Sequence, residues 1–188
     1  QALKEMPKVC PHFHLSLQSG CEATLKRMNR HYTPEEYLEG CRILREVFEN
    51  PAITTDVIVG FPGETEEEFE ETREFLKKVH FYEMHIFKYS RRAGTRADRM
   101  PDQVPESVKT ARSEALLEME RQMSLEYRKS FLGKKCGVLL EEPEVIGGKR
   151  YVTGHTREYV RIAVENGCRG EIVTGIPEKM LTDEVALL

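Results

Sequence analysis

The sequence predicts a mixed fold in two parts: an α/β domain over residues 1–132 and a small, all-β antiparallel barrel over residues 133–188. In the first part, apolar strand patterns alternate with helical periods, which is typical of a parallel sheet covered by helices. After Gly133, short alternating segments and Gly-containing hairpin signals replace the helical periods. Such a run of short strands is typical of a small barrel of the OB-like kind.

The composition narrows the class of protein before any motif is considered. The chain has 188 residues, 39% of them apolar, and carries a formal net charge of -4, so it has enough material for a core and is not a wholly basic nucleic-acid binder. No apolar run approaches the roughly 20 residues of a membrane span, and we expect a cytoplasmic protein without membrane partners. Its five cysteines are widely spaced, which indicates reduced thiols rather than a disulfide framework and provides no metal-ligand set.

The segment Pro11 to Ser19 alternates between apolar and polar side chains, which predicts a strand. One face carries Phe13, Leu15 and Leu17, and the other carries polar residues that would line the inside of a parallel barrel. The alternative is an ordinary amphipathic strand with its polar face in water. A short helix follows, and a pair of arginines on it, Arg27 and Arg30, could hold a carboxylate.

Two helices begin at unusually clear capping signals. Thr33, Pro34 and Glu36 predict a helix with an apolar stripe formed by Tyr37, Cys41, Leu44 and Phe48, in which Cys41 is a packed thiol. Thr65 and Glu68 have the same capping-box spacing.

The segment Thr54 to Phe69 moves from a strand through a turn into the second of these helices. Its apolar run suits a strand covered on both faces, and Gly60, Pro62 and Gly63 then end it. Ligands bind at the carboxyl edge of such sheets, where this turn lies. An anion at the turn is a rival reading, but six acidic residues between Glu64 and Glu71 would repel a phosphate there.

The next predicted strand, Phe81 to Ser90, runs into a basic loop ending at Arg99, which is a plausible phosphate-contacting rim. A long helix is then predicted over Val104 to Phe131. Its expected apolar stripe consists of Val108, Ala111, Ala115, Met119, Met123 and Tyr127.

Hairpin signals organise the tail. Gly147-Gly148 predicts one hairpin turn, and Asn166-Gly167 predicts a second between strands at Tyr159 to Val164 and Glu171 to Val173. About five short strands are expected. With eight basic and nine acidic residues after position 132, charge alone does not predict nucleic-acid binding by this unit.

Three strings in order, HLSLQSGC with TLKRMNRHYT, DVIVGFPGET, and FKYSRRAGTRADRM, resemble the radical S-adenosylmethionine (SAM) methylthiotransferase family. The tail string GHTREYVRIAV resembles the RNA-binding TRAM domain that ends those enzymes. The resemblance implies the C-terminal half of a radical SAM (β/α)6 partial barrel followed by a TRAM barrel. LSLQSGC, the Met84-His85 pair and the tail look most like the branch that methylthiolates threonylcarbamoyladenosine in tRNA.

The resemblance also implies roles for residues at the matching positions. Those expected to bind the cofactor SAM are Ser16, Gln18, Ser19, Arg27, Arg30, Asp56, Ile58, Gly60, Phe61, Tyr89 and Ser90. Those expected to contact tRNA are Arg91, Arg92, Arg96, Lys149, Arg150, Arg157, Tyr159 and Arg161. Such enzymes use two 4Fe-4S clusters, but this chain lacks the CxxxCxxC triad that holds the first, so it contains no catalytic residue in this reading.

Several further expectations follow. The chain reads as a fragment, inactive by itself, whose strand at Phe13 to Leu17 has an exposed barrel edge through which copies could associate. Two alternatives stay open: a methylthiotransferase of another branch, acting on isopentenyladenosine in tRNA or on a ribosomal protein, and a non-catalytic RNA-binding module with the barrel half as scaffold.

Overall fold

The computed structural model describes residues 2–188 and separates into two compact units. The first unit comprises residues 13–49 and 53–123, and the second comprises the segment ending at His12, residues 50–52 and residues 124–188. Each unit is described by itself. The domain boundary expected at residue 132 stays a prediction.

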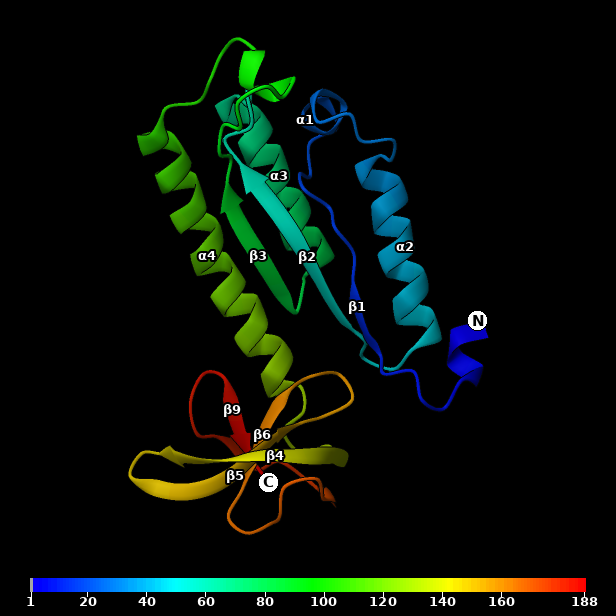
Figure 1. Cartoon of the computed structure of the whole chain (residues 1–188). Coiled ribbons are helices and arrows are strands. Elements are labelled where there is room, and N and C mark those ends of the chain that lie inside the picture. Colours follow the sequence, from blue (N-terminus) through cyan, green and yellow to red (C-terminus); the bar gives the residue numbers. More distant parts are fainter. Residues whose placement is uncertain (1) are drawn as a thin grey trace. The chain divides into compact units, whose positions relative to one another are not determined.

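The first unit is a parallel α/β layer built on a three-stranded sheet in the order β1-β2-β3. Its strands are β1 (His12–His14), β2 (Ala52–Val59) and β3 (Glu83–Lys88), and β2 pairs with β3 in parallel. Its helices are α1 (Glu22–Arg27), α2 (Pro34–Val47), α3 (Glu66–Val79) and α4 (Glu106–Lys129) (Figure 1). The end of α4 belongs to the second unit. Two short 3-10 helices are η1 (Ala2–Glu5) in the second unit and η2 (Ala97–Arg99) in the first.

The core of this unit lies on one face of the sheet. Ile53, Val57 and Val59 of β2 are at most 1% exposed and pack with buried residues of α2, α3 and α4. Asp56 and Ile58, which point to the other face, are only half-buried. The expectation that β2 is covered on both faces is therefore wrong for its second half, whereas Ala52 and Thr54, on the same face, are buried.

The capping signals were read correctly. Thr33 and Glu36 form a reciprocal capping box at the start of α2, and Thr65 and Glu68 do so at the start of α3. Cys41 is fully buried in the core, and burial raises the pKa of its thiol to about 11. The prediction that Cys41 is a packing residue is confirmed.

Three local predictions need correction. The strand expected over Pro11 to Ser19 is limited to His12–His14, with Gln18 adding an isolated bridge to Val57. Between them the Thr55 hydroxyl replaces the backbone ladder, because it accepts from the Leu17 N–H and donates to the Leu15 carbonyl oxygen. Arg30, which was expected on the same short helix as Arg27, lies beyond it, because α1 ends at Arg27.

The apolar stripe expected along α4 is confirmed at Met119 and Met123, which join the core, but it is misplaced in the first half of the helix. Ala111 and Ala115 are exposed, whereas Lys109, Arg112 and Leu116 are buried. In the first half of α4, the buried face is therefore the one that carries Lys109 and Arg112, not the one that carries Ala111 and Ala115. The partners of the two basic side chains are described below.

The second unit contains a six-stranded sheet in the order β7-β4-β5-β6-β9-β8. The strands are β4 (Cys136–Ile146), β5 (Lys149–His155), β6 (Arg161–Val164), β7 (Ile172–Gly175), β8 (Lys179–Met180) and β9 (Val185–Leu187). The Gly147-Gly148 hairpin between β4 and β5 is confirmed.

Two expectations about this sheet are wrong. The strands flanking Asn166-Gly167 do not form a hairpin, because β7 pairs with β4 and β6 pairs with β5 and β9. The sheet is not wholly antiparallel, since β6 and β9 run in parallel. Assignment of this unit as a TRAM domain stays a prediction. Among residues 2–188, no helix is long and apolar enough to cross a membrane.

Candidate functional site

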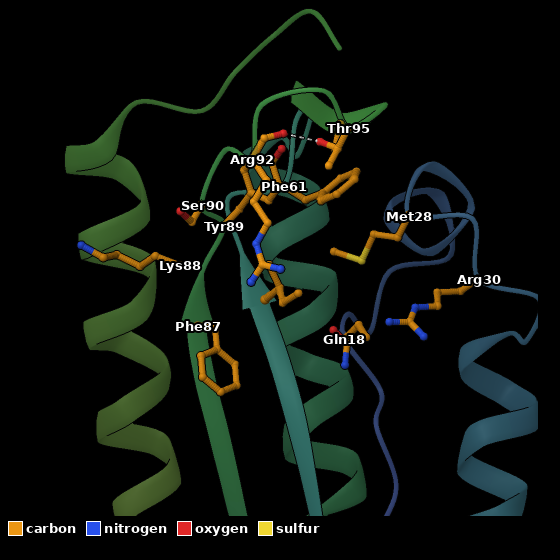
Figure 2. A pocket seen from close by; sticks show the side chains of 12 residues that line it. Gln18, Met28, Arg30, Phe61, Phe87, Lys88, Tyr89, Ser90, Arg92 and Thr95 are labelled. Atoms are coloured by element: carbon orange, nitrogen blue, oxygen red, sulfur yellow. Dashed lines mark hydrogen bonds between the residues drawn. The ribbon is translucent and has the colours of Figure 1, made fainter. Parts of the chain in front are cut away.

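A pocket of about 530 Å³ opens at the carboxyl end of the parallel sheet in the first unit (Figure 2). It collects residues from the β1–α1 region, the end of β2 and the loop after β3, which are distant in sequence. The lining residues are Gln18, Met28, Arg30, Ile58, Phe61, Phe87, Lys88, Tyr89, Ser90, Arg92, Thr95 and Ala97. Its volume lies within the range of about 300–1,000 Å³ typical of small-molecule sites.

Cationic groups give this pocket its electrostatic character. Figure 2 shows the Arg92 side chain reaching down from the loop after β3 and the Arg30 side chain reaching in from the segment after α1. Within residues 2–188 neither guanidinium has an ion-pair partner, whereas Lys88 pairs with Glu106 at 2.6 Å. No acidic side chain lines the pocket. Two unneutralised guanidinium groups suit a carboxylate or phosphate.

Tyr89 supplies a second sign that the pocket receives a polar ligand. Its hydroxyl is buried but has no hydrogen-bond partner in the described part of the chain. The ring is held by an edge contact with Phe61, at 5.2 Å between centroids, and by Lys109 Nζ, 5.5 Å from the ring centre. An unsatisfied buried hydroxyl costs about 1–3 kcal/mol, which a ligand polar atom would recover.

The turn after β2 is fixed by a buried ion pair. Gly60 has φ of 72° and donates its backbone N–H to Glu64 Oε1 at 2.8 Å. Arg112 of α4 donates to the same oxygen at 2.7 Å, and the two side chains are only 6% and 3% exposed. Burial raises the pKa of Glu64 from its ordinary value, against the lowering effects of Gly60 and Arg112. The pair ties α4 to the turn that borders the pocket.

Lys109 explains why position 60 is a glycine. A Cβ at Gly60 would lie 2.3 Å from Lys109 Cγ, and the Lys109 ammonium donates to the Tyr89 carbonyl oxygen at 3.0 Å. The lysine stem therefore fills the space that a side chain at position 60 would need, and its charged end holds the loop after β3.

The structure brings together seven of the residues expected to bind SAM or RNA and leaves others outside the pocket. Those in its lining are Gln18, Arg30, Ile58, Phe61, Tyr89, Ser90 and Arg92. Arg27 instead pairs with Glu68 of the α3 cap, and this hydrogen bond raises the pKa of its guanidinium. The expected Arg27–Arg30 pair is therefore split between a structural and a pocket position.

The remaining cofactor-site candidates have other contacts. Ser19 is buried and shares a hydrogen bond with Thr72 at 3.0 Å. Ser16 and Asp56 bond each other at 3.1 Å on the open sheet face, outside the pocket lining. Of the residues expected to contact tRNA, Arg91, in the loop after β3, pairs with Asp98 at 3.0 Å.

The RNA candidates of the second unit fall into two groups. Lys149 pairs with Glu165, and Arg161 pairs with Glu144, so these two strand cations are neutralised. Arg157 and Tyr159 lie in the loop between β5 and β6, where Arg157 donates to the carbonyl oxygens of Pro7 and Val9 at 3.0 and 2.6 Å. Arg150 is exposed on β5.

A smaller pocket of about 310 Å³ lies beside this loop, and sequence reasoning missed it. It is lined by Cys10, Gly137, Leu139, Glu141, His155, Thr156, Arg157, Tyr159 and Ile172. The His155 and Tyr159 rings stack at 4.2 Å with an interplanar angle of 11°. Exposed aromatic rings beside an apolar surface can stack on nucleobases. The sequence signal was the histidine four residues before the tyrosine, but only the turn at Tyr159, with φ of 71°, brings the rings together.

The basic pair on α4 was missed as well. Lys109 and Arg112 are three residues apart and in line with Leu116, a spacing that places all three on one helix face. Because basic side chains usually face water, the sequence pattern did not predict that this face of α4 is buried.

Comparison with known proteins adds a family context. Residues 1–76 match the model of the Radical SAM superfamily. The chain is 46% identical over 140 residues to a tRNA-2-methylthio-N(6)-dimethylallyladenosine synthase of Caldicellulosiruptor saccharolyticus, covering 74% of this chain and 30% of that protein. It is 42% identical over 161 residues to the threonylcarbamoyladenosine tRNA methylthiotransferase MtaB of Thermotoga maritima, covering 86% and 36%.

A synthase of the first kind from Thermoanaerobacter sp. is 49% identical over 140 residues, covering 74% of this chain and 30% of that protein. The chain thus spans about a third of the length of the curated relatives it matches. Its first 76 residues are thus similar to the Radical SAM superfamily, and the relatives it matches are named as tRNA methylthiotransferases of two kinds.

Proposed function

We propose that this chain is the part of a radical SAM tRNA methylthiotransferase that holds the nucleoside of SAM at the carboxyl edge of its parallel sheet. The observation that carries the proposal is the pocket itself, in which unpaired Arg30 and Arg92 and the unpartnered Tyr89 hydroxyl surround an apolar wall. The homologues' names agree with this assignment.

SAM suits this donor set in three respects. Its methionyl carboxylate matches a guanidinium, its adenine suits the apolar surfaces of Ile58 and Phe61, and its ribose hydroxyls can bond the Tyr89 hydroxyl. Gly60 allows the tight turn that ends β2 at this edge of the sheet, with a φ of 72° and its N–H bonded to Glu64.

In such an enzyme, SAM bound to a reduced 4Fe-4S cluster supplies the radical that activates an adenine C–H bond. The residues of this chain bind and orient the cofactor. Arg30 would hold the carboxylate, Tyr89 would bond the sugar, and Ile58 with Phe61 would exclude water from the adenosyl group. Lys109 and the Glu64–Arg112 pair keep the two loops that carry these groups in place.

Calorimetric titration of the chain with S-adenosylhomocysteine tests the assignment. Ile58→Asp should abolish binding, because it places a carboxylate where the adenine packs, and Tyr89→Phe should weaken binding about tenfold through the loss of one hydrogen bond. Tyr151→Phe, in the second unit, is the matched control and should bind normally. Equal affinity in all three variants would refute the pocket assignment.

We further propose that the modified substrate is adenosine next to the tRNA anticodon, in its threonylcarbamoyl form. LSLQSGC, the Met84-His85 pair and the tail support this branch, whereas relatives of the dimethylallyladenosine branch support the alternative. Mass spectrometry of tRNA nucleosides from cells lacking the gene distinguishes the two. Loss of the methylthio group from threonylcarbamoyladenosine supports the first, and loss from dimethylallyladenosine supports the second.

The second unit is proposed to contact tRNA through Arg150, Arg157 and Tyr159. The stacked His155 and Tyr159 rings beside the 310 Å³ pocket support this, as does Arg157, which lines the pocket and has no ion-pair partner among residues 2–188. Tyr159→Ala should reduce tRNA affinity several-fold in a filter-binding assay, since stacking contributes about 1–3 kcal/mol per base. Unchanged affinity would favour contact through the loop after β3 alone, where Arg92 and Arg96 lie.

A further inference from the structure

Three metal-ligating side chains gather on the open face of the first unit's sheet, outside the pocket described above. They are His14 of β1, Asp56 of β2 and His85 of β3. One ligand atom from each lies within 4.8 Å of the others. No residue of this cluster lines the 530 Å³ pocket.

Strand pairing places the three side chains together. Asp56 and His85 are direct partners in the parallel β2–β3 register. The backbone N–H groups of Leu15 and Gln18 donate to the carbonyl oxygens of Thr54 and Asp56, at 2.9 and 2.8 Å, which holds the segment with His14 alongside β2. Because side chains alternate along a strand, Asp56 faces away from the buried Thr55 and Val57. The cluster is therefore a consequence of the backbone, not of chance surface proximity.

The distances suit a metal ion. His14 Nε2 lies 3.3 Å from Asp56 Oδ2, and bonds of about 2.0–2.1 Å to one ion require a ligand-to-ligand separation of about 3.0–3.4 Å. The Ser16 hydroxyl lies 3.1 Å from the same carboxylate oxygen and 3.2 Å from the same ring nitrogen. His85 completes the set by a side-chain rotation, since its ligand atom is already within 4.8 Å.

A second contact orients the first ligand. His14 Nδ1 lies 3.0 Å from Thr54 Oγ1, and Thr54 is 3% exposed. When Nδ1 donates its proton to this hydroxyl, the Nε2 lone pair is directed toward Asp56. A metal-bound histidine characteristically has its other nitrogen fixed in this way.

We propose that His14, Asp56 and His85 bind a single divalent transition-metal ion. Two imidazoles and one carboxylate select Zn²⁺, Fe²⁺ or Co²⁺ over Mg²⁺ or Ca²⁺, which prefer oxygen ligands throughout. Both histidines are exposed, so the ion keeps open positions for water or for an oxygen of a bound substrate. The proposal gives Asp56, which the resemblance assigned to SAM, a different role, and it uses no residue that lines the 530 Å³ pocket.

Titration of the full chain with Zn²⁺ by calorimetry provides the first test. We expect one equivalent to bind, and His85→Ala and Asp56→Asn to weaken binding by about a hundredfold or more. Thr54→Val, which removes only the orienting hydroxyl, should weaken it about tenfold. His31→Ala removes an exposed histidine outside the cluster and should leave the affinity unchanged.

Co²⁺ absorption distinguishes this site from the exposed thiols of Cys10 and Cys168. The cluster gives ligand-field bands without a thiolate charge-transfer band, and these bands should vanish in Asp56→Asn. Circular dichroism confirms that each variant is folded, and Asp56→Asn keeps the size of the side chain. Zn²⁺ binding that is absent, or equal in the ligand variants and the parent chain, would overturn the proposal. A thiolate band that persists in Asp56→Asn would do so as well.

Discussion

The contact between Gly60 and Lys109 fixes two loops that border the candidate site. The glycine has a positive φ, and the lysine stem occupies the space beside its Cα before donating to the carbonyl oxygen of Tyr89. A larger residue at position 60 would displace the Lys109 stem and with it the contact to Tyr89, so the turn after β2 and the loop after β3 are positioned together.

Gly60→Ala should therefore destabilise the protein by about 2–4 kcal/mol, combining left-handed strain with a clash against Lys109. Urea unfolding measures this loss. Gly94→Ala is the matched control, because φ is 84° there but nothing lies within 4 Å of the added Cβ, so only about 1–2 kcal/mol of strain is expected. Equal losses in the two variants would contradict the role given to Lys109.

Removal of Arg112 should cost about 3–5 kcal/mol, because Arg112→Gln leaves the Glu64 carboxylate buried without its cation. Arg121→Gln removes a cation that is 63% exposed and should change stability by less than about 0.5 kcal/mol.

The Arg112→Gln deficit should also depend on pH. Burial raises the pKa of Glu64, so the folded variant binds a proton more readily than the unfolded chain does. Its stability therefore rises as pH falls, and the deficit relative to the parent should shrink from pH 8 toward pH 5. Urea midpoints at several pH values measure this, and a deficit that grows on acidification would contradict it.

At the residue scale, sequence reasoning located the positions but not their partners. Gln18, Ile58, Phe61 and Tyr89, which the motif strings assigned to SAM, line one pocket, and their role in binding it stays a prediction. Arg27 does not line the pocket, because it forms an ion pair with Glu68 of the α3 cap. The spacing of residues along the sequence cannot predict an ion pair between two such distant segments.

At the scale of elements, α2 offers a simple test of helix propensity. Gly40 lies inside this helix, and nothing is within 4 Å of a Cβ added there. Gly40→Ala should therefore raise the free energy of unfolding by about 0.5–1 kcal/mol, since alanine loses less backbone entropy in a helix. Thermal unfolding followed by circular dichroism measures the gain. A loss of stability would show that the helix needs the glycine for another reason.

Elements with strong local signals were predictable, and those set by long-range pairing were not. The capping boxes of α2 and α3 and the Gly147-Gly148 hairpin are confirmed, because caps and tight turns are specified within a few residues. The hairpin at Asn166-Gly167 is absent because β7 pairs with β4, a choice made by tertiary packing. The stripe of α4 was misread because an ion pair buries its polar side.

At the scale of the whole chain, cysteine spacing yields a prediction about cofactors. Five free thiols without a CxxxCxxC triad should not assemble a stoichiometric 4Fe-4S cluster, so the chain alone should be inactive in radical chemistry. Iron and sulfide analysis after anaerobic reconstitution measures this. Four irons per chain would contradict the prediction.

Self-association also belongs to this scale and stays a prediction. β1 is an edge strand of three residues, and its free edge is expected to pair with a second copy at high concentration. Light scattering that shows a monomer throughout would contradict it. The change in periodicity near Gly133 indicated a chain in two parts. The parallel pairing of β6 with β9 could not be predicted, because it joins two segments that are separated in sequence and linked by no local turn signal.

The placement of β9 has a practical consequence for anyone trimming the protein. The last strand sits between β6 and β8, in the interior of the six-stranded order, and Leu188 donates its N–H to Ala163. Deleting even the final four residues would therefore open a gap inside the sheet and leave β8 with no neighbour to hold it. A purification tag is safer added beyond Leu188 through a flexible spacer than in exchange for any of these residues.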